Sequence, residues 1–309
     1  MEPLLLSVVS VAADWPLLLS AVGLGLCVGT ITGLFGAGGG FIIVPSLNAL
    51  LGVPMTTAVG TGAAHVLGGS SIALWRQLDR RFLGIRVAGA MAVGIPPGTR
   101  LGLAVVERLK HVGTIGVFSR EVVAADFVLQ AVFAGFLAML AFWMVLDNFW
   151  LRRGQGDDEQ NHRGILAWVR IPPMCSARTI PGGPISIPLL FLFGVFEGFV
   201  AGLLGIGGSV IMMPALFYLI GQTTKYATQT CLMLAFVSGL SATIQHGIVG
   251  NIDYTLAAAL IFGAFSGTKL GTVIRSRITG RSIRQYFGFV VGGAVLLPLC
   301  KLLTMLVGG

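Results

Sequence analysis

Hydrophobic runs divide the chain into ten segments separated by short polar stretches. In the first half they cover residues 17–35, 40–51, 57–75, 84–106 and 124–150, and in the second half residues 186–204, 209–221, 226–248, 253–275 and 284–307. A helix needs about 20 apolar residues to cross the hydrocarbon core of a bilayer. The second segment of each half is too short for this. The pattern predicts an all-α polytopic membrane protein with five hydrophobic segments in each half.

A charged stretch from Arg152 to Arg178 separates the two halves and carries Asp157, Asp158 and Glu159. Such a stretch is typical of a solvated connector and leaves no room for a folded soluble domain. We therefore expect a first transmembrane repeat over residues 1–150, a cytoplasmic connector over 151–185, and a second transmembrane repeat over 186–309.

The two halves share an internal repeat. Residues 33–46 read GLFGAGGGFIIVPS and residues 202–215 read GLLGIGGSVIMMPA, with seven identities in fourteen positions at an offset of 202 − 33 = 169. The same offset, without a gap, aligns GTRLG at 98–102 with GTKLG at 267–271. Two separated motifs in one register indicate duplicated halves.

An odd number of segments in each half means that the second copy enters the membrane from the opposite side, which predicts an inverted repeat. Three arginine clusters then share one face: Arg76, Arg80, Arg81 and Arg86; five arginines of the connector; and Arg275, Arg277, Arg281 and Arg284. The positive-inside rule makes that face cytoplasmic. Arg108, Lys110 and Arg120 fall on the other face and oppose this topology. If the short segments are re-entrant hairpins, the parity changes.

Composition supports a membrane location. Hydrophobic residues make up 55% of the chain and charged residues 10%, with a mean hydropathy of +0.90, which a water-soluble protein of this length would not tolerate. The net charge of +8 comes from basic residues that flank apolar segments, so it indicates topology and no nucleic-acid partner. The four cysteines, Cys27, Cys175, Cys231 and Cys300, lack metal-ligand spacing and are interpreted mainly as small core residues.

The repeated glycine motif is the first candidate binding site. Each copy has the form GLxGxGG followed by apolar residues and a proline, Pro45 or Pro214. Glycines allow backbone N–H groups to converge, and the following helix presents its positive N-terminal end, so the motif suits an anion. Broken helices of this kind hold substrate in many transporters. Close packing of helices is the alternative explanation for the glycines.

The third segment of each half carries unusual polarity. Thr57, Thr61 and His65 are four residues apart and share one helical face, and the partner segment carries Thr230 and Ser238. Hydroxyl groups can replace a hydration shell without a fixed charge. Hydrogen bonding between helices is the competing explanation.

Three charged residues stand inside hydrophobic segments. Glu197 lies within FLFGVFEGFVAG, and its repeat partner is Val28, so the duplicated framework does not require a carboxyl group there. Together with His65 it is a candidate for coupling transport to protons or another cation. Arg100 and Lys269 are repeat partners that could attract an anion or extend to the membrane interface.

The sequence shows no enzyme signature: it has no HExxH, no GxSxG and no His/Cys cluster with metal spacing. We therefore expect no catalytic residues, no metal and no cofactor. GLFGAGGGFIIVPSLNALLGV and GLLGIGGSVIMMPALFYLIG, however, resemble the two signature stretches of the TauE/SafE sulfite-exporter family.

This resemblance covers both repeats and implies a permease of the bacterial inner (plasma) membrane for sulfite, sulfonates or related organic anions, often exporting them. The binding site that it implies includes Gly36, Gly38, Gly39, Gly40, Gly205, Gly207, Gly208 and Ser209. Alternating access would come from one half rocking against the other. An anion channel, or a membrane protein of sulfur metabolism that uses Cys231 or Cys27, is the alternative. The anion itself and a homo-oligomeric state stay open.

Overall fold

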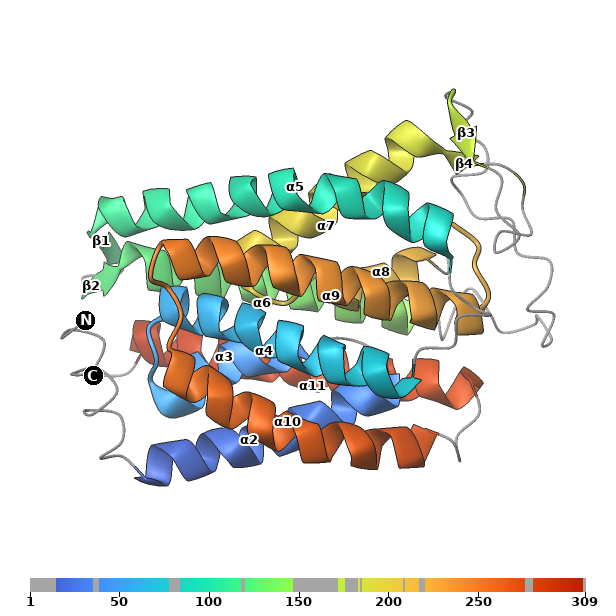
Figure 1. Cartoon of the computed structure of the whole chain (residues 1–309). Coiled ribbons are helices and arrows are strands. Elements are labelled where there is room, and N and C mark those ends of the chain that lie inside the picture. Colours follow the sequence, from blue (N-terminus) through green and yellow to red (C-terminus); the bar gives the residue numbers. More distant parts are fainter. Residues whose placement is uncertain are drawn as a thin grey trace.

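The computed structural model describes residues 15–35, 39–77, 84–117, 120–146, 172–175, 183, 185–207, 209–216, 220–275 and 280–307. This part of the chain forms a bundle of ten helices with four short strands (Figure 1). The first half contains α2 (Trp15–Phe35), α3 (Gly40–Leu51), α4 (Met55–Gln77), α5 (Ile85–Val112) and α6 (Ala124–Leu146). The second half contains α7 (Ile187–Leu204), α8 (Ser209–Pro214), α9 (Thr224–Ile248), α10 (Tyr254–Arg275) and α11 (Gly280–Val307). Each predicted segment therefore holds a helix.

Seven of the described helices are long and apolar enough to cross a membrane: α2, α5, α6, α7, α9, α10 and α11. α3 is apolar but has only 12 residues. α4 has 23 residues, but with its threonines, serines and histidine it is not among the helices apolar enough to cross a membrane. The chain is thus a multi-pass, predominantly helical membrane protein.

Two short strand pairs lie outside the helices of this all-α fold. β1 (Thr114–Val117) and β2 (Arg120–Val123) form an antiparallel hairpin between α5 and α6, and β3 (Met174–Cys175) pairs with β4 (Ile185–Ser186) beside the start of α7. The hairpin follows Gly113, which ends α5, and its strands are rich in β-branched residues, which favour extended backbone. Most of the predicted connector lies outside the described residues.

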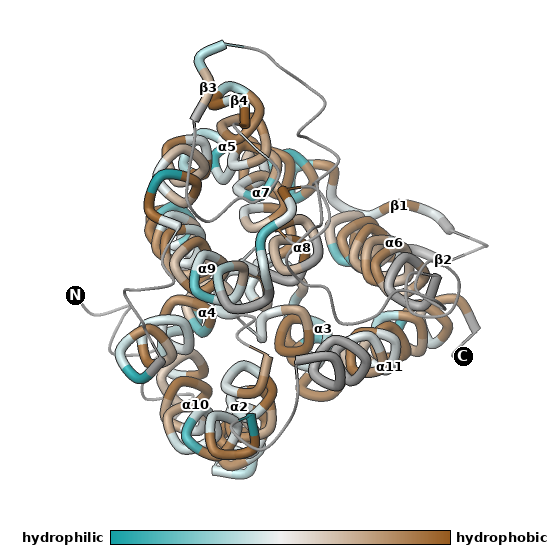
Figure 2. Tube along the Cα trace, turned by 90° about the vertical axis from the view of Figure 1, so that its right-hand side faces the viewer, coloured by the Kyte–Doolittle hydropathy of each residue, from teal (hydrophilic) through white to brown (hydrophobic). Residues whose placement is uncertain are grey.

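Figure 2 looks along the bundle and shows its arrangement. α5 lies beside α7 at one edge, α2 beside α10 at the opposite edge, and α6 beside α11 on a third side. α3, α4, α8 and α9 occupy the middle. The end of α4, the start of α5 and the end of α10 lie at the same end of the bundle, and they carry Arg76, Arg86 and Arg275 (Figure 1).

Glycines bring the two edge pairs of helices into backbone contact. A Cβ atom at Gly25, Gly29 or Gly33 of α2 would lie within 2.6 Å of the backbone of Leu260, Ala264 or Thr268 of α10. A Cβ atom at Gly194, Gly198 or Gly202 of α7 would lie within 2.3 Å of the backbone of Met91, Ile95 or Thr99 of α5. The two contacts are related by the repeat. Adding 169 to the numbers of the α2 glycines gives the α7 glycines, and subtracting 169 from the numbers of the contacted α10 residues gives the contacted α5 residues. Small residues allow such close approach between membrane helices.

The helices related by this offset run in opposite directions. In Figure 1, α2 and α4 run from left to right, whereas their counterparts α7 and α9 run from right to left. α6 and α11, the last helices of the two halves, also run in opposite directions.

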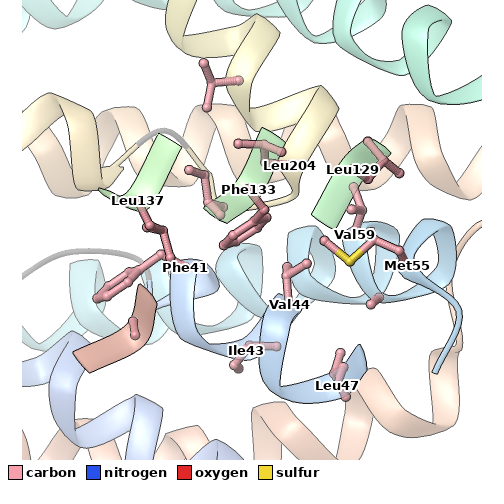
Figure 3. Close-up of a cluster of buried hydrophobic side chains, with 14 of the residues drawn as sticks. Phe41, Ile43, Val44, Leu47, Met55, Val59, Leu129, Phe133, Leu137 and Leu204 are labelled. Carbon is pink, nitrogen blue, oxygen red and sulfur yellow. The ribbon is translucent and has the colours of Figure 1, made fainter. Parts of the chain in front are cut away.

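Most of α3 is enclosed by protein, and only Leu50 near its end is exposed. Phe41, Ile43, Val44 and Leu47 are fully buried, and Figure 3 shows them packed against side chains of α4, α6 and α7, among them Met55, Val59, Leu129, Phe133, Leu137 and Leu204. A helix that is apolar all round belongs in the interior. This short helix is therefore held by the surrounding helices rather than by lipid.

Candidate functional site

The first glycine segment leads into the buried start of α3. Gly39 has a φ of +66°, a left-handed conformation that favours glycine, and a Cβ atom there would lie 2.5 Å from Thr32 Oγ1 and Val28 Cγ1. The first N–H groups of a helix have no acceptor within the helix, and the helix dipole makes this end positive. The predicted site residues Gly36 and Gly38 lie outside the described residues.

The second glycine segment follows α7. Gly205 has a φ of +67° and donates its N–H to the Ala201 carbonyl at 2.9 Å, which ends the helix, and Gly207 has a φ of +66°. Gly208 lies outside the described residues. Ser209 begins α8, and its side chain is not described. The described part of α8, Ser209–Pro214, is a short helix of six residues.

The two glycine segments meet in the middle of the bundle. A Cβ atom at Gly40 would lie 2.9 Å from the Gly205 carbonyl oxygen and from Ile206 Cα. The Val66 side chain of α4 lies beside both segments. It would be 2.7 Å from a Cβ atom at Gly40 and 2.3 Å from a Cβ atom at Gly207. The glycines that were predicted from separate halves of the chain are therefore neighbours.

α4 places the two polar site candidates of the first half beside this contact. His65 directly precedes Val66 and is fully buried, and neither ring nitrogen has a hydrogen-bond partner among the described residues. Thr61 is also buried, but its Oγ1 accepts a hydrogen bond of 3.1 Å from the Asp253 backbone N–H at the start of α10. Thr61 thus has a structural partner, whereas His65 has an unused donor.

α9 supplies the two candidates of the second half. Ser238 Oγ donates to the Gly207 carbonyl at 2.8 Å, so this hydroxyl holds the second glycine segment in place. Thr230 is fully buried, and its Oγ1 has no partner among the described residues. Among the described residues predicted to bind substrate, Thr230 and His65 therefore have buried polar side-chain atoms without a hydrogen-bond partner.

A line of hydrogen bonds that sequence reasoning missed runs from one end of the bundle to the second glycine segment. Lys110 Nζ of α5 donates to Asn251 Oδ1, Asn251 Nδ2 lies 3.4 Å from His246 Nδ1, and His246 Nε2 lies 2.9 Å from the Gly202 carbonyl. A lysine can only donate and a carbonyl can only accept. The proton of the neutral His246 ring therefore lies on Nε2, and every bond in the line donates toward Gly202.

The charged candidates occupy different environments. Arg100 of α5 and Lys269 of α10 are exposed on the outer faces of their helices, which suits contact with the membrane interface better than contact with the glycine segments. Glu197 of α7 is fully buried, and both of its carboxyl oxygens lack a hydrogen-bond partner among the described residues.

The cysteines correct part of the interpretation as core residues. Cys231 of α9 is buried, but Cys27 of α2 and Cys300 of α11 are exposed on the surfaces of their helices. Cys27 therefore lies away from the centre, which removes it as a reactive thiol beside the glycine segments. In the described part of the chain, no group of three or more His, Cys, Asp or Glu side chains could hold a metal ion.

Comparison with known proteins identifies the relatives of the chain. Residues 21–297 match the family described as "Sulfite exporter TauE/SafE". The chain is 25% identical to "Probable membrane transporter protein YunE" of Bacillus subtilis (strain 168), covering 84% of this chain and 89% of the relative. It is also 25% identical to "Probable membrane transporter protein YjnA" of the same organism, covering 92% and 99%. A "Probable membrane transporter protein" of Xylella fastidiosa (strain 9a5c) is 24% identical, covering 89% and 92%.

No solved structure matches the chain. The family match extends over most of the chain and includes both glycine segments and all or most of each long helix. The relatives are matched over almost their full length and carry the names of membrane transporters. This chain is therefore a multi-pass membrane transporter that belongs to the TauE/SafE family.

Proposed function

We propose that the chain is a permease that moves a small anion, such as sulfite, a sulfonate or a related organic anion, across the inner membrane by alternating access. The substrate class rests on the family description, which names sulfite export. The proposal for the binding site rests on one structural observation. Two glycine segments meet at the centre of the bundle beside buried polar groups that carry no fixed charge.

The proposed binding groups are neutral hydrogen-bond donors. The start of α3 offers backbone N–H groups and the positive end of a helix, His65 offers a ring N–H, and Thr230 offers a hydroxyl. A neutral site suits a substrate that must leave again, because no buried cation has to be separated from it. The full set that we assign to the site is Gly36, Gly38, Gly39, Gly40, Thr61, His65, Gly205, Gly207, Gly208, Ser209, Thr230 and Ser238.

We further propose that the two halves form an inverted repeat. The matching glycine contacts and the opposite directions of the related helices support this (Figure 1). Each glycine-packed pair, α2 with α10 and α5 with α7, combines one helix from each half. We therefore place the movement of alternating access between these pairs rather than between the two halves.

Export is the direction that we propose for an anion that crosses alone. An interior-negative potential of about 100 mV favours expulsion of a monoanion by about 2.3 kcal/mol. Uptake against this potential would require a coupled ion.

The proposal is tested by measuring uptake of labelled sulfite, sulfoacetate and thiosulfate into proteoliposomes, at zero and at imposed membrane potential. The informative variant is Thr230→Val, which removes one hydroxyl and keeps the shape of the side chain. Because this hydroxyl has no partner among the described residues, its loss should not lower thermal stability. We expect saturable uptake of at least one anion, with a KM raised about tenfold in the variant if one hydrogen bond to the anion is lost.

Thr243→Val is the matched control. Thr243 is on the same helix, and its hydroxyl is also buried without a partner among the described residues, but it lies 13 residues further along, or about 20 Å. Its KM should equal that of the unmodified protein. Uptake no faster than in protein-free liposomes, from protein that is folded and monodisperse, would refute the substrate class. A rate that never saturates would favour a channel.

A further inference from the structure

Glu197 has an environment that a structural carboxyl group would not have. It lies in the middle of α7, ten residues after Ile187, and is fully buried among apolar neighbours. Neither carboxyl oxygen has a hydrogen-bond partner among the described residues. A buried carboxylate without a partner costs several kcal/mol, whereas a neutral acid costs much less. The closed structure therefore accommodates this side chain best in its protonated form.

The position of α7 is fixed, so Glu197 has no access to the lipid interface by rotation of its helix. Gly194 and Gly198 on either side of it lie directly against the backbone of α5, where a Cβ atom would be 2.0 or 2.1 Å from the carbonyl oxygens of Met91 and Ile95. A rotation of α7 would move these glycines away and bring larger side chains into the contact. The carboxyl group is held inside the bundle.

The repeat shows what this position faces. The counterpart of Glu197 at the offset of 169 is Val28 of α2, and the Val28 side chain touches the first glycine segment, since a Cβ atom at Gly39 would lie 2.5 Å from Val28 Cγ1. A valine satisfies the packing at that position. The carboxyl group in the second half is therefore an addition to the duplicated framework, placed at the helix position that faces a glycine segment in the first half.

The charged and titratable groups around Glu197 leave its charge uncompensated. Cys231 of α9 is close enough to interact electrostatically with Glu197. Among the other titratable side chains on the described helices that pack against α7, His65 of α4 is buried and has no hydrogen-bond partner. The rest interact elsewhere or are at least partly exposed: Arg76 of α4, Arg86, Arg100, Glu107, Arg108, Lys110 and His111 of α5, Asp126 of α6, and Tyr226 and His246 of α9. No cation among the described residues pairs with this carboxyl group.

We propose that Glu197 binds a proton whenever the anion binds, so that the permease carries about one proton with each anion. The inference rests on the function proposed above. When the empty site is open to water, the carboxyl group is hydrated and carries one negative charge. When a monoanion binds nearby, repulsion between the two negative charges favours transfer of a proton from water to a carboxyl oxygen. The proton returns to water on the side where the anion is released. The occupied site, which holds the anion and the neutral acid, therefore has the same net charge as the empty site with its carboxylate.

This coupling changes the driving force. Linkage is reciprocal, so a lower pH tightens anion binding and anion binding draws in a proton. Movement of a monoanion together with a proton carries no net charge, and the membrane potential no longer selects its direction. The gradients of the anion and of protons then set the direction, and an inward proton gradient drives uptake.

The first test measures proton uptake by the purified protein in weakly buffered detergent solution when the transported anion is added. We expect about one proton per bound anion for the unmodified protein and none for Glu197→Gln, because the amide resembles the protonated acid and cannot titrate. Glu107→Gln is the matched control, since Glu107 lies near the end of α5 and is partly exposed. It should keep the full proton uptake.

The second test records anion and proton influx into the same proteoliposomes, the latter with an internal pH-sensitive dye. The unmodified protein should move both ions in a ratio near one, at a rate that an imposed potential does not change. Glu197→Gln should exchange anions without moving protons, and its net flux should respond to the potential. Anion transport without protons by the unmodified protein would overturn this inference and leave the proposed function intact. The absence of any anion transport would overturn both.

Discussion

The tight contact between α5 and α7 gives a quantitative prediction for Gly98. A Cβ atom at this position would lie 2.0 Å from the Val195 carbonyl oxygen and 2.9 Å from the Phe199 backbone nitrogen. A carbon and an oxygen atom in contact are normally about 3.3–3.6 Å apart. In a Gly98→Ala variant the two helices must therefore separate locally by about 1 Å or more. The neighbouring glycines along the same interface would lose their contacts as well.

The energetic effect has two opposing parts. Inserting a methyl group into a packed interface costs about 1–3 kcal/mol, whereas alanine stabilises a helix by up to about 1 kcal/mol relative to glycine. The matched control is Gly89→Ala, at a position in the same helix where a Cβ atom would meet nothing within 4 Å. Both variants have the same gain in helix propensity. We expect Gly98→Ala to be less stable than Gly89→Ala by about 1–3 kcal/mol.

The assay is thermal unfolding of the purified variants in one detergent, followed by intrinsic tryptophan fluorescence. Gly98→Ala should melt at least a few degrees below Gly89→Ala. Gly267→Ala, the counterpart of Gly98 in α10, should show the same decrease, because a Cβ atom there would lie 2.1 Å from the Leu26 carbonyl oxygen. Equal melting temperatures for Gly98→Ala and Gly89→Ala would show that α5 and α7 do not approach this closely.

Two pairs of variants test two polar contacts at the end of the bundle opposite the arginine clusters. Asn251→Leu removes the link between Lys110 and His246 and should destabilise the protein by about 1–3 kcal/mol, because it leaves a buried imidazole nitrogen without a donor. Lys110→Met removes only the exposed end of the line and should lower the stability less. Equal thermal stabilities for the two variants would contradict this. Asp126→Ala removes the carboxylate that accepts a hydrogen bond of 2.8 Å from the Met55 N–H at the start of α4, and it should lower the stability by about 0.5–2 kcal/mol. Asp126→Asn keeps an acceptor oxygen and should recover most of the loss. Unchanged hydrogen exchange at the start of α4 in Asp126→Ala would rule this role out.

The helices could be predicted from the sequence because each apolar run is long and bounded by polar residues. The predicted segment 40–51 agrees with α3, Gly40–Leu51, and 253–275 agrees with α10 within one residue. The hairpin of β1 and β2 could not be predicted in the same way, since a four-residue strand outside the membrane has no hydrophobic periodicity to reveal it.

The candidate site could be predicted only as a set of residue types. Thr61, His65, Thr230 and Ser238 were conspicuous because they are polar residues within apolar runs. Which of them have partners depends on contacts between distant parts of the chain, such as the 192 residues between Thr61 and Asp253. The line from Lys110 to Gly202 was missed for the same reason. Its members come from three segments and have no repeated counterpart that would have drawn attention to them.

The glycines of the chain serve two different purposes, and this difference bears on the mechanism. Those at the contacts of α2 with α10 and of α5 with α7 lie in regular helices and join one helix of each half by backbone contacts that any side chain would break. Those at Gly39, Gly205 and Gly207 have positive φ angles and lie where helices end or begin. The first group joins helices of different halves into firm units, so the halves cannot separate as independent bodies. The second group interrupts the helices between these units, and under the proposed function a change in the relative position of the units would open or close a path to the buried polar groups there.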